Sequence, residues 1–410
     1  MADILHCDLN NFYTSVECLT RPELKNLPVA VCGSQKERHG IVLAKNQIAK
    51  QCGVKTGMSN MEALKICKNL VILSPNFEKY IYYSNIVRSI YLQYTDLVEC
   101  FGIDECWLDV THSKIFGTPL EIAEKLRCEV FEKTGLTISV GVSFNKIFAK
   151  IGSDYKKPNA ITVIDKNNFK DIVWKLNVED MLGVGKKTKD KLNKIGIYTI
   201  GELAKVDKNF LVNKFKKWGE YLYNYANGLD VNPVTNYFEI KKVKSVGNST
   251  TFYKDLTNNN EVLCGLTTLC NSICERLQKH NLPPPKTLHL TIKNNKLESL
   301  SKQITLQKPT AEAQQLIKQA FSLFKKMYDW HLPIRKLGVS VCNFASKNVQ
   351  LSFFDNEQKK QKAKQQIDAT LIDIRNKYGK DLIINGNYLF DKKLAKPITH
   401  DLLDIHYFGK

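Results

Sequence analysis

The sequence predicts an α+β fold with several domains, and three patterns along the chain support this prediction. Up to about residue 165, apolar strands and amphipathic helices alternate in the order of a βαββαβ sheet, with its helices on one side. Residues 166–238 change to short helices. Residues 240–348 contain four strand-like segments and two helical stretches, which predicts a four-stranded sheet backed by two helices. The 410 residues are enough for two to four domains.

The first elements follow from short apolar and polar runs. The segment DILHCD predicts a strand that ends on Asp8. The following LNNFYTSVECL predicts a helix capped by Asn10 or Asn11. VECFGIDECWLDVT, residues 98–111, predicts a pair of strands. In a βαββαβ sheet, we expect the first strand and this strand pair to be neighbours.

The net charge is strongly positive and unevenly distributed. The chain carries a formal charge of +19, and residues 241–347 contain 17 Lys and Arg against 6 Asp and Glu. Residues 1–164 contain 19 basic and 17 acidic side chains. Such an excess favours a polyanionic partner, above all nucleic acid, and places its contact in the second half of the chain. The alternative is a basic surface that only confers solubility.

Other bulk features exclude several classes of protein. The 12 cysteines occur singly, without a C-x-x-C pair, which argues against a disulfide framework and a structural zinc site. No apolar run approaches the roughly 20 residues of a membrane helix, and the N-terminus has no secretory signal pattern. We therefore expect a cytoplasmic protein with free thiols and no membrane association.

Three carboxylates are predicted to converge in the first domain. Asp104 and Glu105 lie side by side in an otherwise apolar strand pair, where two charged groups are costly to bury. Asp8 ends the neighbouring strand, and three nearby carboxylates repel one another unless cations hold them. Hard oxygen ligands favour Mg²⁺, and two such ions about 3.5–4 Å apart are a common device for nucleotidyl transfer. The alternative is a buried ion pair between one of these carboxylates and a lysine.

Candidate phosphate-binding groups accompany these acids. The helix after Asp8 can receive a phosphate at its N-terminal amides. Five lysines are candidates to neutralise a triphosphate: Lys50, Lys146, Lys150, Lys156 and Lys157. The segment LGVGKKT resembles a helix-hairpin-helix, which binds DNA phosphates without reading sequence, and a plain helical hairpin is the alternative. Its candidate DNA-binding residues are Gly183, Gly185, Lys186 and Lys187.

Five segments together resemble the Y-family translesion DNA polymerases, in the order in which that family has them. They are HCDLNNFYTSVE, FGIDECWLDVT, GVSFNKIFAKIGSDYKKPNA, LGVGKKT and KSVGNSTTF. The resemblance covers about residues 1–348 and implies a right-hand polymerase fold. Its domains would be a βαββαβ palm (1–12 and 81–165), small fingers (13–80), a helix-hairpin-helix thumb (166–238), an α/β little finger (241–348) and a tail (349–410).

The resemblance also implies roles for the site residues. Asp8, Asp104 and Glu105 would hold two Mg²⁺ ions, with help from the Leu9 carbonyl, and Glu105 would complete the catalytic set. The primer 3′-hydroxyl would then attack the α-phosphate of a dNTP. Tyr13 would be the steric gate that leaves no room for a ribose 2′-hydroxyl. Further nucleotide contacts would come from Phe12, Gln47, Lys50 and Lys157.

The fingers depart from the family pattern. The family usually grips the triphosphate with Ser or Thr, Tyr and Arg, whereas GIVLAKNQIAK has Ala44, Gln47 and Lys50. Gln47 can still donate a hydrogen bond, and Lys50 keeps the charge without the planar fork of Arg. We expect weaker triphosphate binding unless other lysines compensate. A second departure is Gly102, where the family has Ser, and we expect activity to survive it because the acidic residues remain.

The partners implied are primer-template DNA and dNTPs, bound by a monomer. The little finger, including Lys244 and Ser245, would grip DNA phosphates without sequence preference, so binding should weaken with salt. No segment outside these domains is large enough for a proofreading exonuclease, which is consistent with the low fidelity that the family implies.

The tail contains a short apolar peptide. VQLSFFDNE, residues 349–357, resembles the peptide by which bacterial polymerases dock on the sliding clamp (beta), and an edge strand is the alternative. Its candidate clamp-binding residues are Gln350, Leu351, Phe353 and Phe354. Residues 366–383 have the spacing of an amphipathic helix, to which we assign no function.

Two other functions fit parts of the sequence. One is a clamp-tethered, DNA-binding scaffold of the same fold that has weak catalysis or none. The other is a palm-type nucleotide cyclase, which needs no duplex grip and so leaves the basic region unexplained. The complete acidic set and Tyr13 favour the polymerase.

Overall fold

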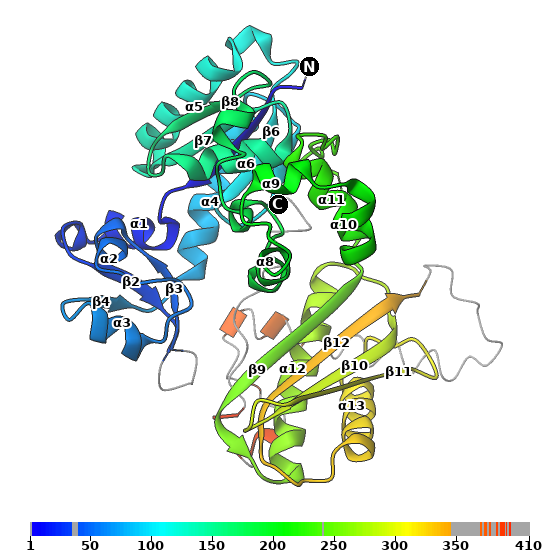
Figure 1. The fold of residues 1–410 in the computed structure, drawn as a ribbon. Coiled ribbons are helices and arrows are strands. Elements are labelled where there is room, and N and C mark those ends of the chain that lie inside the picture. Colours follow the sequence, from blue (N-terminus) through cyan, green and yellow to red (C-terminus); the bar gives the residue numbers. More distant parts are fainter. Residues whose placement is uncertain are drawn as a thin grey trace. The chain divides into compact units, whose positions relative to one another are not determined.

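The computed structural model of the protein describes residues 2–34, 40–239 and 242–345, together with a few positions between 370 and 394. Most of these residues belong to two units, one within Met1–Gly33 and Ile41–Lys241 and the other within Lys242–Asp401 (Figure 1). Within the described part of the chain, no helix is long and apolar enough to cross a membrane.

A five-stranded sheet organises the first unit. Its strands are β1 (Ile4–Leu9), β5 (Val98–Cys100), β6 (Glu105–Asp109), β7 (Ile138–Ser143) and β8 (Ile161–Ile164). They lie in the order β5-β6-β1-β7-β8, and β1 is antiparallel to both β6 and β7. The prediction that the first strand lies beside the strand pair is therefore confirmed.

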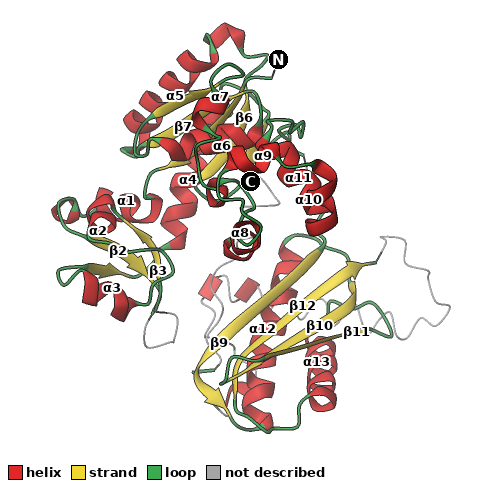
Figure 2. Ribbon diagram, viewed as in Figure 1, coloured by secondary structure: helices red, strands yellow, loops and turns green. Residues whose placement is uncertain are grey.

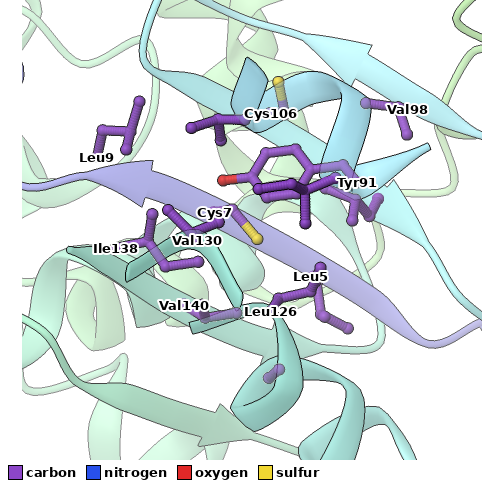
Figure 3. Close-up of a cluster of buried hydrophobic side chains, with 14 of the residues drawn as sticks. Leu5, Cys7, Leu9, Tyr91, Val98, Cys106, Leu126, Val130, Ile138 and Val140 are labelled. Atoms are coloured by element: carbon purple, nitrogen blue, oxygen red, sulfur yellow. The ribbon is translucent and has the colours of Figure 1, made fainter. Parts of the chain in front are cut away.

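Helices cover both faces of this sheet, so the prediction of helices on one side was wrong. The helices are α4 (Phe77–Tyr91), α5 (Pro119–Thr134) and α6 (Lys146–Tyr155). Leu5 and Cys7 of β1 cluster with Leu126 of α5 (Figure 3). His6, which points to the opposite face because side chains alternate along a strand, contacts Ser153 of α6.

The close approach of α6 to the sheet depends on glycine. A Cβ on Gly141 of β7 would lie 1.8 Å from the carbonyl oxygen of Ala149, and a Cβ on Gly152 would lie 3.0 Å from the Gly141 Cα. The backbones of helix and strand are thus in direct contact. This contact brings Lys150 and Ser153 over the face of β1 that carries Asp8.

Helix α1 (Phe12–Leu19) begins directly after β1, but its predicted side-chain cap was wrong. Asn11 occupies the cap position with a φ of 49°, and its side chain makes no capping hydrogen bond. The Asn10 side chain is engaged elsewhere, because it donates to Thr137 and accepts from Ser139. These bonds tie the end of β1 to β7 instead of capping the helix.

A smaller sheet and a series of short helices complete the first unit. The sheet consists of β2 (Val29–Cys32), β3 (Val42–Lys45) and β4 (Val71–Leu73), with α2 (Gln47–Gln51) and α3 (Asn60–Ile66) beside it in sequence. The helices after β8 are α7 (Phe169–Ile172), η4 (Val178–Asp180), α8 (Lys186–Asn193), α9 (Ile200–Lys205), α10 (Lys208–Phe215) and α11 (Lys217–Ala226). Two single turns are η1 (Pro22–Leu24) and η3 (Lys114–Phe116).

The second unit is a four-stranded antiparallel sheet with two helices on one face (Figure 2). Its elements are β9 (Ser245–Leu256), α12 (Asn259–Lys279), β10 (Pro285–Asn294), β11 (Ser299–Thr305), α13 (Ala313–Met327) and β12 (Ile334–Phe344). The strand order is β11-β10-β12-β9. Leu288, Leu290 and Ile292 are buried on the helix side, in alternation with more exposed neighbours. The predicted four strands and two helices are confirmed.

Part of the tail packs against the second unit. Residues Gly386–Leu389 form η5, and Leu394 beyond it is buried. Tyr253 donates to Asp391 Oδ2 at 2.6 Å, and Thr268 of α12 donates to the Leu394 carbonyl at 3.2 Å. In the predicted helix at 366–383, the few positions that the structure assigns to secondary structure are helical, and most of the rest lie outside the described residues.

Candidate active site

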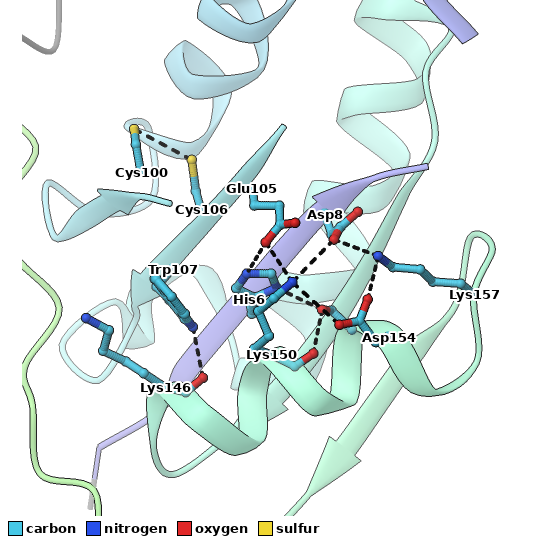
Figure 4. Close-up of polar contacts among 11 residues, drawn as sticks. His6, Asp8, Cys100, Glu105, Cys106, Trp107, Lys146, Lys150, Asp154 and Lys157 are labelled. Carbon is cyan, nitrogen blue, oxygen red and sulfur yellow. Dashed lines mark hydrogen bonds and ion pairs between the residues drawn. The ribbon is translucent and has the colours of Figure 1, made fainter. Parts of the chain in front are cut away.

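Asp8 and Glu105 face each other across neighbouring strands (Figure 4). The Leu9 amide donates to the Asp104 carbonyl at 3.0 Å. This bond makes Asp8 and Glu105 a non-hydrogen-bonded cross-strand pair, in which opposite side chains approach most closely. The strand register alone therefore brings together two acids that are 97 positions apart in the sequence.

Asp104 lies in the turn between β5 and β6, beside this pair. Helix α4 fixes the turn, because Arg88 Nη2 donates to the Gly102 carbonyl at 2.9 Å and the Ser84 hydroxyl donates to the Ile103 carbonyl. Burial, and secondly the charge of Glu105, raise the pKa of Asp104 to about 6. Burial and the neighbouring negative charge both disfavour the ionised carboxylate, and a cation beside Asp104 would act in the opposite direction.

Two lysines neutralise the acidic pair. Lys150 Nζ lies 2.6 Å from Glu105 Oε2 and 3.8 Å from Asp8 Oδ2, and Lys157 Nζ lies 2.6 Å from Asp8 Oδ2. Asp154 contacts both ammonium groups, at 3.5 and 2.7 Å. The buried ion pair considered as an alternative is thus present at Glu105. It is compatible with a metal site, because ammonium groups here stand where a cation would bind.

Burial and charge act in opposite directions on the pair. Burial raises the pKa of Asp8 against the charge of Lys157. Burial alone would also raise the pKa of Glu105, but the charge of Lys150 at 2.6 Å acts to hold that pKa below its usual range. Glu105 is therefore ionised at neutral pH, whereas protons compete with cations for the carboxylate of Asp8.

His6 is a component of the site that the sequence prediction missed. Its side chain is 0% exposed, and its ring meets Trp107 edge to face, with 5.1 Å between ring centroids. Nδ1 lies 2.8 Å from Ser153 Oγ, and Nε2 lies 3.4 Å from Glu105 Oε2. Burial is the main cause that lowers the pKa of His6 to about 4. A signal was available, because residues two apart in a strand share a face and His6 precedes Asp8 by two.

Tyr13 lies on the first turn of α1, next to the acidic groups. Its ring stacks on Tyr80, with 4.3 Å between centroids, and meets Phe77 edge to face at 5.9 Å. Burial, and secondly the charge of Asp104, raise the pKa of Tyr13 to about 12. Phe12 is buried in the core cluster with Tyr80, so it supports this aromatic group from the inside.

The predicted triphosphate contacts of the smaller sheet lie on β3 and α2. Ala44 belongs to β3, and Gln47 and Lys50 belong to α2, whose N-terminus is capped by the Asn46 side chain. Burial, and secondly the charge of Lys50, lower the pKa of Lys45. Lys45 and Lys50 therefore form a local cationic pair, and Lys45 is a candidate phosphate contact that the sequence prediction missed.

The remaining predicted contacts are distributed over both units. Gly183 has a φ of 84°, and Gly185 caps α8. The other predicted DNA-binding residues are exposed: Lys186, Lys187, Lys244 and Ser245. Of the lysines proposed for a triphosphate, Lys146 instead pairs with Glu99 at 2.8 Å. The four clamp-peptide candidates, Gln350, Leu351, Phe353 and Phe354, lie outside the described residues.

The donor set fits a divalent cation. One oxygen of Asp8, one oxygen of Glu105 and one nitrogen of His6 all lie within 4.8 Å of one another. Carboxylates that attract two ammonium groups can exchange them for a metal ion, since hard oxygen donors bind Mg²⁺, Ca²⁺ and Mn²⁺. Asp104 stands outside this group of three and adds a further carboxylate beside it.

Comparison with protein families gives three matches along the chain. Residues 7–154 match the impB/mucB/samB family, and residues 243–353 match the C-terminal domain of the same family. Residues 179–230 match a thumb domain described as that of DNA polymerase-iota. In chain order, the three matches cover the first part of the first unit, its short helices and the second unit.

Individual proteins are similar over nearly the whole chain. DNA polymerase IV of Acetivibrio thermocellus is 45% identical over 397 residues, which cover 96% of this chain and 99% of that protein. DNA polymerase IV 1 of Bacillus subtilis is 38% identical over 387 residues, 93% of this chain and 92% of that protein. A solved structure, the Y-family DNA polymerase chimera Dbh-Dpo4(243-245)-Dbh, matches with a TM-score of 0.73 and 26% identity, covering 83% of this chain and 99% of the chimera.

Proposed function

Because this chain belongs to the impB/mucB/samB family of Y-family DNA polymerases, we propose that it is a template-directed, low-fidelity DNA polymerase of translesion synthesis. It adds dNTPs to a primer 3′-hydroxyl and has no proofreading activity. The observation that carries the proposal is the facing pair Asp8 and Glu105, with Asp104 in the adjoining turn and Tyr13 directly after the strand.

We assign the metal site to these acids. Asp8, Asp104, Glu105 and the Leu9 carbonyl would hold two Mg²⁺ ions, which would activate the primer hydroxyl and neutralise the triphosphate. The nearby lysines would contact the triphosphate. Lys157, now on Asp8, would turn to the triphosphate when a metal ion takes over the carboxylate. Gln47 and Lys50 would reach the same phosphates from α2.

Sugar selection is assigned to Tyr13. Its ring is fixed by the stack on Tyr80 and the edge contact with Phe77, so it cannot easily move aside for a 2′-hydroxyl. Phe12 is proposed to act through this packing, since it lies in the core rather than on the surface.

We propose the domain roles from the same family. The five-stranded sheet is the palm (1–12 and 81–165), the smaller sheet the fingers (13–80), and the short helices the thumb (166–238). The second unit is the little finger (241–348), followed by the tail. On the sheet face away from its helices, a groove of about 390 Å³ is lined mainly by small and polar residues, among them Gly247, Ser249, Gly338 and Lys336. Small side chains allow close approach of a DNA backbone, and lysines nearby make the binding salt-dependent.

The tail peptide is proposed to dock on the sliding clamp, through Gln350, Leu351, Phe353 and Phe354. An apolar peptide with a glutamine suits a hydrophobic groove. Replacing Gln350, Phe353 and Phe354 with Ala should remove stimulation by the clamp and leave synthesis without the clamp unchanged. We further propose a monomeric, cytoplasmic enzyme.

The scaffold alternative is disfavoured, because every acidic position and Tyr13 are retained. Primer extension decides between the two. The polymerase should extend an annealed primer with the nucleotide complementary to each template base, and only when Mg²⁺ and dNTPs are present. Binding of primer-template without any extension would support the scaffold.

A further inference from the structure

The His6 ring is held beneath the acidic pair with one nitrogen directed at it (Figure 4). The side chain is fully buried, under α6 and against Trp107. The proposed Mg²⁺ ions do not account for this nitrogen, because Mg²⁺ prefers oxygen ligands. The ion pairs of Lys150 and Lys157 with the carboxylates do not involve it either.

The contacts of Ser153 favour one position for the proton of the His6 ring. Ser153 Oγ donates its only hydrogen to the Lys150 carbonyl at 2.8 Å. With that hydrogen on the carbonyl, Ser153 Oγ accepts from His6 Nδ1, which lies 2.8 Å away. In a neutral ring, Nε2 then presents a lone pair.

That lone pair faces another acceptor. His6 Nε2 lies 3.4 Å from Glu105 Oε2, beyond ordinary hydrogen-bond distance, and has no hydrogen-bond partner among the described residues. A doubly protonated ring would place a third positive group beside the Lys150 and Lys157 ammonium groups. Two buried acceptors that face each other are instead stabilised by a cation between them.

We propose that His6 Nε2 is a metal ligand which, with Asp8 and Glu105, gives this site a nitrogen-containing donor set for a divalent transition ion such as Mn²⁺. The three donor atoms lie within 4.8 Å of one another, and imidazole nitrogen binds first-row transition ions in preference to Mg²⁺. The bound ion replaces Lys150 at Glu105 Oε2, because both cations use the same oxygen. The proposal rests on the metal-binding role of Asp8 and Glu105, but not on catalysis.

Pulsed electron paramagnetic resonance of the full-length protein with Mn²⁺, without DNA, tests the assignment directly. The wild type should show coupling of Mn²⁺ to a histidine nitrogen, confirmed by ¹⁵N-histidine labelling. His6→Phe should lose the coupling and bind Mn²⁺ about tenfold more weakly or worse, with Mg²⁺ affinity changed much less. His289→Phe is the matched control and should keep the coupling.

The outcomes separate the proposal from the polymerase assignment. Two results would overturn the assignment of His6 as a ligand. One is Mn²⁺ binding that is lost in Glu105→Gln but shows no nitrogen coupling in the wild type. The other is a nitrogen coupling that persists in His6→Phe. Mn²⁺ binding that is indifferent to Glu105→Gln would also overturn it. If His6→Phe does not fold, disappearance of the wild-type nitrogen coupling in Glu105→Gln supports the proposal. Primer extension with Mg²⁺ is measured separately and can succeed or fail independently.

Discussion

Tyr13 and Tyr80 stack with their ring planes 10° apart and 4.3 Å between centroids. Tyr80 is itself anchored, because its hydroxyl donates to Glu17 Oε1 at 2.9 Å. The proposed sugar gate is therefore a rigid ring on a braced neighbour. This packing links the first helix of the chain to α4, which also holds the turn that carries Asp104.

Replacing Tyr13 with Ala should admit ribonucleotides. Removal of the ring opens the space that a 2′-hydroxyl needs, so we expect discrimination against rNTPs to fall at least about tenfold. Single-nucleotide incorporation of a dNTP and the matching rNTP measures the ratio. Tyr82→Ala, at a ring on α4 that is 62% exposed, is the control and should keep the wild-type ratio. Unchanged sugar selection in Tyr13→Ala would remove the gate assignment.

Stability without metal should fall as pH rises. The pKa of Asp104 is about 6 in the folded protein, above its ordinary 3.8, so folding takes up a proton between these values. Metal-free protein should thus lose on the order of 2 kcal/mol of unfolding free energy between about pH 4 and pH 6 from this group. Asp104→Asn should lack this loss in melts with a chelator. Parallel pH profiles for the two proteins would show that the Asp104 carboxyl is not the titrating group.

Gly141→Ala should displace α6. The added Cβ would lie 1.8 Å from a backbone oxygen, and backbone cannot swing aside as a side chain can. We expect destabilisation on the order of 3 kcal/mol or more, by chemical denaturation. Gly185→Ala adds the same methyl group where nothing lies within 4 Å, and should cost much less, at most about 1 kcal/mol from its N-cap position. Equal stability of the two variants would mean that α6 does not rest on the β7 backbone.

The tail contact should contribute to the stability of the second unit. Leu394 is 4% exposed, and its carbonyl accepts from Thr268 of α12. Leu394→Ala should cost about 2–3 kcal/mol, as other large-to-small core changes do. Leu300→Ala, at a leucine of β11 that is 45% exposed, should cost much less. If both variants melt alike, the tail does not pack on α12 in solution.

The order of strands and helices was predictable from the sequence because apolar spacing repeats along each element. That order predicted that β1 lies beside β6, and therefore that Asp8 and Glu105 lie close together. The position of α6 was not predictable in the same way, because its contact depends on backbone proximity at Gly141 and Gly152, which carry no apolar side chain.

Local polar residues gave the least reliable predictions. Asn10 and Asn11 have the composition of a helix cap, yet Asn10 bonds to Thr137 and Ser139 on a distant segment. Such long-range partners cannot be read from local sequence. The same holds for Lys150, whose choice of Glu105 over a nucleotide phosphate depends on the tertiary fold.

Primer extension by the wild type and Asp104→Asn tests the central claim most directly. On an undamaged primer-template with Mg²⁺ and dNTPs, the wild type should extend, and Asp104→Asn should be slower by roughly 100- to 1000-fold or more while binding the same DNA. Asp171→Asn, at an exposed acid on α7, should extend like the wild type. Equal extension by the wild type and Asp104→Asn would contradict the assignment of catalysis to this acidic site.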